Sequence, residues 1–118
     1  MKQLIVFLSS IFFSVTAFAQ KKGVVTEHYN VLGNCGTCKK RIENAAFIKG
    51  VKRVEWNKTT KDLTLTYDNT KVGAEDVMKS IAKVGHESEL VKVSENDPAY
   101  KKLPSCCAYK SNTCEDDE

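Results

Sequence analysis

The spacing of apolar residues between positions 24 and 93 constrains the fold more than any other feature of this chain. Apolar and polar side chains follow a strand pattern in four segments, at residues 24–31, 51–57, 63–67 and 89–93. Apolar side chains recur every three to four residues in two segments, which predicts amphipathic helices at residues 37–49 and 74–84. The predicted order is therefore strand, helix, strand, strand, helix, strand.

This order predicts an α+β domain of the ferredoxin-like type, in which two helices cover one face of a four-stranded antiparallel sheet. The predicted core-facing positions of the strands are Val25, Tyr29, Val31, Val54, Trp56, Leu63, Leu65 and Tyr67. Those of the helices are Cys38, Ile42, Ala45, Ala46, Ala74, Val77, Ile81 and Val84. We also expect Met78 in the core, and neither it nor Trp56 is assigned a role as a ligand.

The first nineteen residues have the pattern of a secretory signal peptide. Lys2 precedes a mostly apolar stretch, and the small residues of Ala17-Phe18-Ala19 form a cleavage site before Gln20. The stretch is shorter than the ~20 apolar residues of a membrane span, although an N-terminal anchor is the alternative. We therefore expect an exported, periplasmic or secreted protein with no stable membrane insertion after cleavage. Its parts would be a signal peptide (1–19), a domain (20–94) and a cysteine-containing tail (95–118).

Charge and cysteine content narrow the possible functions. The formal net charge is only +3, from 18 Lys and Arg against 15 Asp and Glu, which is too weak to indicate a nucleic-acid partner. All five cysteines lie after residue 20, in the part expected to reach an oxidising compartment. Small chains with this much sulfur are usually disulfide-bonded, metal-binding or redox-active.

The CxxC motif at Cys35 and Cys38 lies between the first predicted strand and the first predicted helix. The N-terminus of a helix stabilises negative charge and so favours thiolates. The cations Lys39, Lys40 and Arg41 follow directly and add positive potential. Two thiolates on one loop suit a soft ion such as Cu(I), whereas structural zinc usually requires four protein ligands.

With this motif, the chain resembles the heavy-metal-associated domain family of copper chaperones, copper-ATPase modules and mercury-binding proteins. The residues that carry the resemblance are Val31, Gly33, Cys35, Cys38, Ala45, Ala46, Gly50, Val51, Val54 and Gly85. The resemblance implies that Cys35 and Cys38 bind the metal, most simply Cu(I), with Hg(II), Ag(I) or Zn(II) as other candidates. It implies a non-enzymatic metal carrier whose donor or acceptor is a protein such as a copper-transporting ATPase or an efflux component.

The chain departs from the family pattern at two places. Its loop, Gly33-Asn34-Cys35, is one residue shorter than the usual sequence and lacks the methionine that normally packs beneath it. Before the last predicted strand the family often has Gly-Tyr or Gly-Lys, whereas this chain has Gly85-His86. Because imidazole suits copper and zinc, His86 is a possible additional ligand, and an exposed histidine in a turn is the alternative.

Two other functions remain open for the CxxC motif. One is thiol–disulfide exchange in an exported redox protein, although no Trp precedes the motif and no Pro lies between it and residue 98. The other is a secreted domain in which the cysteines form structural disulfides only.

The tail contains three further cysteines, Cys106, Cys107 and Cys114. They are close in sequence and could form a disulfide or a second metal site. Because a short loop closes at low entropic cost, we expect these cysteines to form a unit separate from the CxxC site. Removal of residues 95–118 is then expected to leave the fold nearly intact.

Overall fold

The computed structural model describes residues 23–110, so the predicted signal peptide and Cys114 lie outside the described residues. Its three strands are β1 (Val24–Asn30), β2 (Val51–Trp56) and β3 (Asp62–Asp68). Its helices are α1 (Gly36–Ala46), α2 (Ala74–Lys83), α3 (Pro98–Lys101) and the 3₁₀ turn η1 (Ser105–Cys107). Within residues 23–110, no helix is long and apolar enough to cross a membrane.

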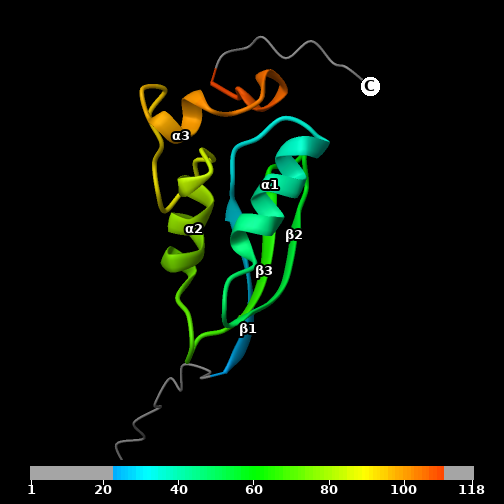
Figure 1. The fold of residues 1–118 in the computed structure, drawn as a ribbon. Coiled ribbons are helices and arrows are strands. Elements are labelled where there is room, and N and C mark those ends of the chain that lie inside the picture. The colour runs from blue at the N-terminus through cyan, green and yellow to red at the C-terminus, as the bar shows by residue number, and fades with distance from the viewer. Residues whose placement is uncertain (1–22, 111–118) are drawn as a thin grey trace, which may run out of the picture.

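The strands form an antiparallel sheet in the order β1-β3-β2, with α1 and α2 on one of its faces (Figure 1). The predicted alternation in β3 is confirmed, because Leu63, Leu65 and Tyr67 are buried while their neighbours are partly exposed. The buried side chains of the sheet and helices form one core, which also contains Val31, Cys38, Ile42, Ala46, Val51, Trp56, Val77, Met78 and Ile81. The α+β class and the ferredoxin-like arrangement of two helices on a sheet are thus confirmed.

The fourth predicted strand, at residues 89–93, does not form. Only a single bridge joins Val31 to Ser88, and two backbone hydrogen bonds flank it, from the Leu32 N–H to the Glu87 carbonyl (2.8 Å) and from the Glu89 N–H to the Asn30 carbonyl (3.1 Å). The chain then turns, because the Ser88 N–H binds the Val91 carbonyl (3.0 Å) and the Ser88 hydroxyl accepts from the Val91 N–H (3.1 Å). The Val91 N–H and carbonyl are used in this turn and cannot extend the ladder along β1. The sheet of the described residues therefore has three strands.

Helix α1 ends three residues earlier than predicted. The N–H of Phe47 still bonds to the Glu43 carbonyl (3.2 Å), but the next N–H, of Ile48, bonds to the nearby Ala46 carbonyl (2.9 Å). Helix α2 matches its prediction to within one residue, and the Asp76 carboxylate accepts a hydrogen bond from the Gly73 N–H (3.1 Å) at its start. Both helices keep their predicted apolar sides against the sheet.

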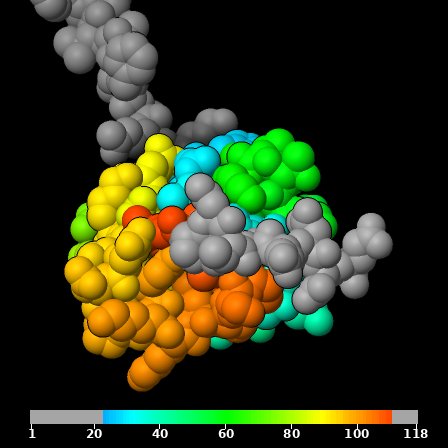
Figure 2. Space-filling view, turned by 90° about the horizontal axis from the view of Figure 1, so that it is seen from above, coloured from blue at the N-terminus to red at the C-terminus, as the bar shows by residue number. Residues whose placement is uncertain are grey.

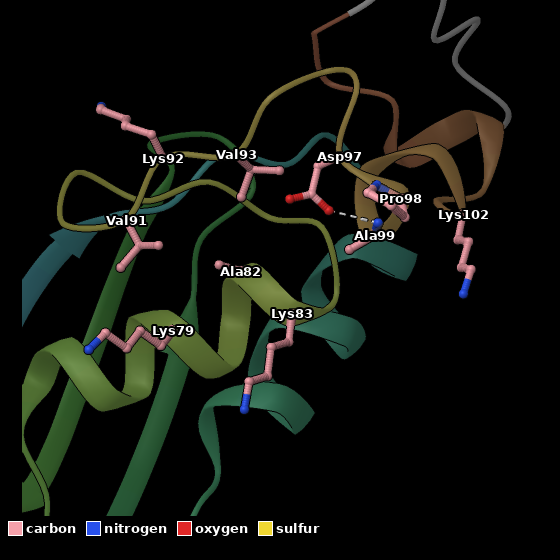
Figure 3. A pocket seen from close by; sticks show the side chains of 10 residues that line it. All are labelled: Lys79, Ala82, Lys83, Val91, Lys92, Val93, Asp97, Pro98, Ala99 and Lys102. Carbon is pink, nitrogen blue, oxygen red and sulfur yellow. Dashed lines mark hydrogen bonds between the residues drawn. The ribbon is translucent and has the colours of Figure 1, made fainter.

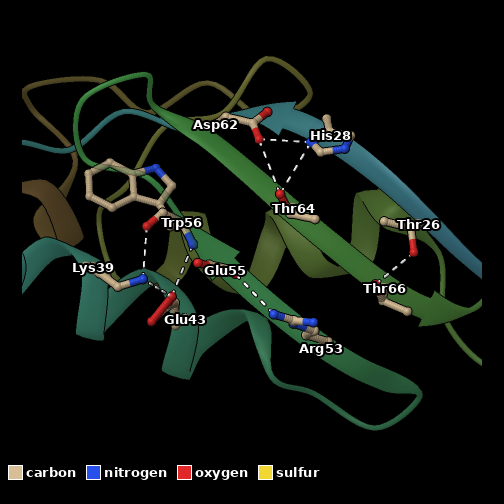
Figure 4. A network of polar contacts seen from close by, with 10 residues as sticks. All are labelled: Thr26, His28, Lys39, Glu43, Arg53, Glu55, Trp56, Asp62, Thr64 and Thr66. Atoms are coloured by element: carbon tan, nitrogen blue, oxygen red, sulfur yellow. Dashed lines mark hydrogen bonds and ion pairs between the residues drawn. The ribbon is translucent and has the colours of Figure 1, made fainter.

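The opposite face of the sheet is polar and open to solvent (Figure 4). The hydroxyls of Thr26 and Thr66 are hydrogen-bonded across β1 and β3 at 2.9 Å, and His28 Nδ1 lies 2.9 Å from the Asp62 carboxylate. Such cross-strand pairs stabilise a sheet surface without burying it. The cysteine thiols lie away from this face, at the end of the molecule where α1 begins.

Residues 95–110 fold back onto the domain (Figure 1). Asp97 caps the start of helix α3, since its side chain accepts from the Ala99 N–H (2.8 Å), and the helix packs against Gly85. A Cβ on Gly85 would lie only 2.7 Å from the Ala99 carbonyl oxygen, and its φ of +94° is one that glycine adopts without strain. From above, the orange part of the chain covers much of this end of the molecule, beside the cyan segment (Figure 2). Residues 95–110 of the tail are thus part of the folded structure.

Candidate metal centre

The CxxC thiols lie at the first turn of α1. Cys35 is the N-cap residue, partly buried, and Cys38 is fully buried against the core. Their sulfur atoms are 3.4 Å apart, well beyond the ~2.05 Å of a disulfide bond. Both side chains therefore stand as thiols that point toward one another and can hold one ion between them.

A third sulfur atom reaches this site from the tail. Cys107, in η1, is fully buried, and its Sγ lies 3.7 Å from the Sγ of Cys35. The sulfur atoms of Cys35, Cys38 and Cys107 all lie within 4.8 Å of one another. The prediction that the tail cysteines form a unit separate from the CxxC site is therefore wrong for Cys107. The sulfur of Cys106 lies 3.9 Å from that of Cys107, and the Cys106 thiol also hydrogen-bonds to Cys35, but it is not one of the three sulfur atoms that all lie within 4.8 Å of one another.

Trp56 supports the loop from beneath. A Cβ on Gly33 would meet the indole ring at 3.0 Å and the Cys38 Cβ at 3.1 Å, so glycine is needed for this close packing. The indole N–H donates to the Val31 carbonyl at 2.9 Å, just before the loop begins. The ring of Trp56 thus lies under a loop that lacks the family's methionine.

Polar contacts tie the start of α1 to the end of β2 (Figure 4). Lys39 Nζ donates to the Glu43 carboxylate (2.6 Å) and to the Trp56 carbonyl (3.0 Å), and Glu43 accepts from the Trp56 N–H (3.1 Å). Arg41 donates to the Val84 carbonyl at 3.1 Å. Of the three cations predicted to tune the site, Lys39 and Arg41 therefore have structural contacts, and Lys40 is exposed.

The three thiols differ in acidity. Partial burial opposes ionisation of Cys35, but hydrogen bonds from the Cys38 N–H and from the neighbouring thiols lower its pKa to about 7. Burial raises the pKa of Cys38. Burial, followed by the interaction with Cys38, raises the pKa of Cys107 strongly. Cys35 is consequently the first of the three to ionise as the pH rises.

In the reduced, metal-free protein, iodoacetamide is expected to label Cys35 first. The thiolate is the reactive form, so the labelling rate should rise around pH 7 rather than around the ordinary thiol value of 9.0. Peptide-resolved mass spectrometry after short labelling pulses from pH 6 to pH 9 measures this. Equal labelling of Cys35 and Cys107 at neutral pH would contradict the predicted order.

His86 is buried and does not lie in an exposed turn. Its Nδ1 is 2.8 Å from the Leu32 carbonyl oxygen, its ring stacks on Tyr109 at 5.6 Å, and burial lowers its pKa. The opposite ring nitrogen, Nε2, is buried without a hydrogen-bond partner. The cluster of mutually close ligand atoms in the described part of the chain contains three sulfur atoms and not the imidazole. Ligation by His86 thus stays a prediction, and its observed contacts place it beside the tail.

The sequence predicts that the run Tyr100, Leu103 and Pro104 packs on the domain, and Tyr100 and Leu103 do so. It did not anticipate the contacts of Tyr109. Tyr109 donates to the Gly85 carbonyl (2.7 Å) and accepts from the Glu87 N–H (2.9 Å), and its ring meets the edge of Tyr100. Tyr100 and Tyr109, which lie near Cys106 and Cys107 in the sequence, were the available signal for a packed tail. Aromatic rings contribute large buried areas to a core, so two of them in one short segment favour packing over exposure to solvent.

A surface hollow lies between α2 and the segment 91–102 (Figure 3). Its lining includes Lys79, Lys83, Lys92 and Lys102 and no cysteine or histidine. Ammonium groups do not bind metal cations, and the one carboxylate of the lining, Asp97, accepts from the Ala99 N–H at the start of α3, so this hollow offers no cluster of ligands for a soft ion.

An α+β domain with three clustered thiols at a helix start has the architecture of a soft-metal-binding domain. A scan against protein families and a search of curated proteins each gave no match. Among solved structures, "CopZ metallochaperone" is 30% identical with a TM-score of 0.52, over 54% of this chain and 98% of that one. Oxidized MerP from Ralstonia metallidurans CH34 is 25% identical with a TM-score of 0.53, over 56% and 94%.

The similarity to CopZ covers nearly all of that protein at 30% identity, and both solved structures share the fold described above. This chain belongs to the heavy-metal-associated domain family, the family of copper and mercury chaperone domains. The N-terminal domain of a potential copper-translocating P-type ATPase from Bacillus subtilis has the same fold, with a TM-score of 0.53 and 21% identity over 63% of this chain and 94% of that one.

Proposed function

We propose that this protein is an exported carrier of Cu(I) that binds the ion through Cys35 and Cys38 and passes it to a partner protein. The observation that carries the proposal is the pair of thiols 3.4 Å apart at the start of α1, in a domain 30% identical to the CopZ metallochaperone. Thiolates select soft ions, so Ag(I), Hg(II) and Zn(II) are competing cargoes. Binding and transfer, without catalysis, are sufficient for this role.

The partner in this proposal is a copper-transporting ATPase or an efflux component. The same fold in the N-terminal domain of a potential copper-translocating P-type ATPase supports it. A carrier and an acceptor that both present thiols can exchange an ion through shared coordination, with no free ion released. Export follows from the predicted signal peptide at residues 1–19 and places the exchange in the periplasm or outside the cell.

The test is competition for Cu(I) against a colorimetric chelator under anaerobic conditions. The wild-type chain should bind one Cu(I) tightly. Cys35→Ser/Cys38→Ser should lower the affinity at least about a hundredfold, because losing a residue that only supports a ligand already costs up to about a hundredfold, and this variant loses both ligands. Thr37→Ser, a change between the two cysteines that keeps both thiols, is the matched control. Unchanged binding by the double variant would reject the CxxC motif as the site.

The same preparation separates the proposal from thiol–disulfide exchange. A redox protein should cycle between thiol and disulfide with a reductant and catalyse exchange in a second protein. A metal carrier should instead keep its thiols reduced when loaded with Cu(I), and loading should protect Cys35 and Cys38 from alkylation. Catalysed exchange without Cu(I) binding would favour the redox function.

A further inference from the structure

We propose that Cys107 is a third metal ligand, so that the C-terminal segment converts the CxxC loop into a three-thiolate site for a soft ion. The inference rests on the proposed function, because it concerns the same ion. It adds a ligand from outside the CxxC motif, 72 residues away from Cys35 in the sequence.

The distances between the sulfur atoms favour three ligands over two. If the metal–sulfur bond is ~2.3 Å, the value for zinc thiolates, a linear two-thiolate site needs sulfur atoms ~4.6 Å apart and a trigonal site needs ~4.0 Å. The observed separations are 3.4 Å for Cys35–Cys38 and 3.7 Å for Cys35–Cys107, with all three sulfur atoms within 4.8 Å. The trigonal arrangement therefore requires the smaller movement.

The burial of Cys107 has a simpler explanation, since a cysteine can fill a core as a small apolar side chain. That explanation accounts for its lack of exposure and for its place in the apolar core. It does not account for the direction of the side chain, which brings Sγ to the two thiols of the loop and not to the apolar side chains alone. A thiol that needed only apolar packing would gain nothing from this position.

The position of Cys107 is fixed by contacts that do not involve a metal. The Cys107 N–H bonds to the Pro104 carbonyl (2.8 Å), which closes the turn η1. Two residues later, the Tyr109 hydroxyl binds Gly85 and Glu87, and Lys110 Nζ forms an ion pair with the Glu87 carboxylate (3.0 Å). The third thiol is therefore held in place before an ion arrives, which lowers the entropic cost of binding.

A third ligand changes how the ion leaves. With Cys107 bound, an acceptor has to displace a thiolate that belongs to the tail before it can take the ion from the CxxC loop. The tail then helps to retain the ion, so the affinity of the carrier for the ion and the rate of ion release depend on the tail. A carrier with the CxxC loop alone has no such step.

The test counts the sulfur neighbours of bound Cu(I) by X-ray absorption spectroscopy, on the purified full chain loaded anaerobically. Three sulfur atoms are expected for the wild type and two for Cys107→Ser. The affinity of Cys107→Ser for Cu(I) should be lower by about tenfold or more, because losing a ligand costs at least as much as losing a residue that supports one. Cys106→Ser is the matched control, since it changes the adjacent residue, and it should keep three sulfur atoms. Cys107→Ala repeats the test without placing a hydroxyl in the core.

The outcomes distinguish this inference from the proposed function. Two sulfur atoms in both the wild type and Cys107→Ser would overturn the third ligand and leave the two-thiolate carrier standing. Loss of one sulfur atom in Cys106→Ser but not in Cys107→Ser would also overturn it. Failure of the wild type to bind Cu(I) at all would instead reject the proposed function. Circular dichroism of each metal-free variant establishes that the sulfur counts refer to folded protein.

Discussion

Trp56→Ala is expected to lower the free energy of unfolding by about 3–5 kcal/mol, the range for removing a large aromatic side chain from a core. Trp56 is 1% exposed, and its ring packs against Gly33 and Cys38 beneath the thiol loop. The substitution also removes the hydrogen bond from the indole N–H to the Val31 carbonyl. Since small domains are stable by only about 5–15 kcal/mol, a loss of this size removes a large part of the stability of the folded state.

Urea denaturation of the reduced, metal-free protein, followed by circular dichroism, measures this effect. Trp56→Phe is the matched control: it keeps an aromatic ring and loses the N–H, so we expect a loss of about 1–2 kcal/mol, mainly from the unpaired carbonyl and the smaller ring. A change below about 1 kcal/mol for Trp56→Ala would contradict the observed packing, because it would mean that the loop closes over the gap at little cost.

Removal of residues 95–118 is expected to destabilise the domain by about 3 kcal/mol or more, since burying a large side chain contributes about 1.5–3 kcal/mol. The deletion removes the buried Tyr100 and Cys107 and exposes the ring of His86, which stacks on Tyr109. It also leaves the Gly85 carbonyl without the Tyr109 hydroxyl. This result would reverse the expectation from sequence that the tail is dispensable for the fold.

The matched control for this deletion is removal of residues 111–118 alone, which keeps every tail contact described above. Thermal unfolding of both shortened chains beside the wild type, in reduced and metal-free buffer, gives the comparison. Equal transition midpoints for the long deletion and the wild type would show that the tail adds no stability. Equal midpoints for the short deletion and the wild type are the expected result.

The main elements were predictable because each depends on a local pattern that agrees with its tertiary contacts. Leu63, Leu65 and Tyr67 alternate cleanly with threonines, and all three are buried in β3. The start of α1 beside Cys35 and Cys38 also follows from the sequence. The last predicted strand failed because the Ser88 hydroxyl and N–H close a local turn with Val91, a competition that side-chain periodicity does not reveal.

The place of Cys107 could not be predicted from spacing. The entropic preference for short loops favoured pairing among the tail cysteines, and it was outweighed by tertiary packing of Tyr100 and Tyr109 and by the close approach of α3 to Gly85. The tail is also held by hydrogen bonds of the Tyr109 hydroxyl to Gly85 and Glu87, 24 and 22 residues earlier, and side-chain periodicity does not reveal such contacts. The burial of His86 was missed for the same reason, because the ring that covers it comes from Tyr109.

The long separation between Cys35 and Cys107 also sets an order of events when the protein is made. Synthesis proceeds from the N-terminus, and contacts that span many residues form late in folding. Cys35 and Cys38 are therefore made 72 and 69 residues before Cys107, so the growing chain carries an open pair of thiols until Cys107 has been added. The thiol cluster can therefore close only after the segment that contains Cys107 has been made.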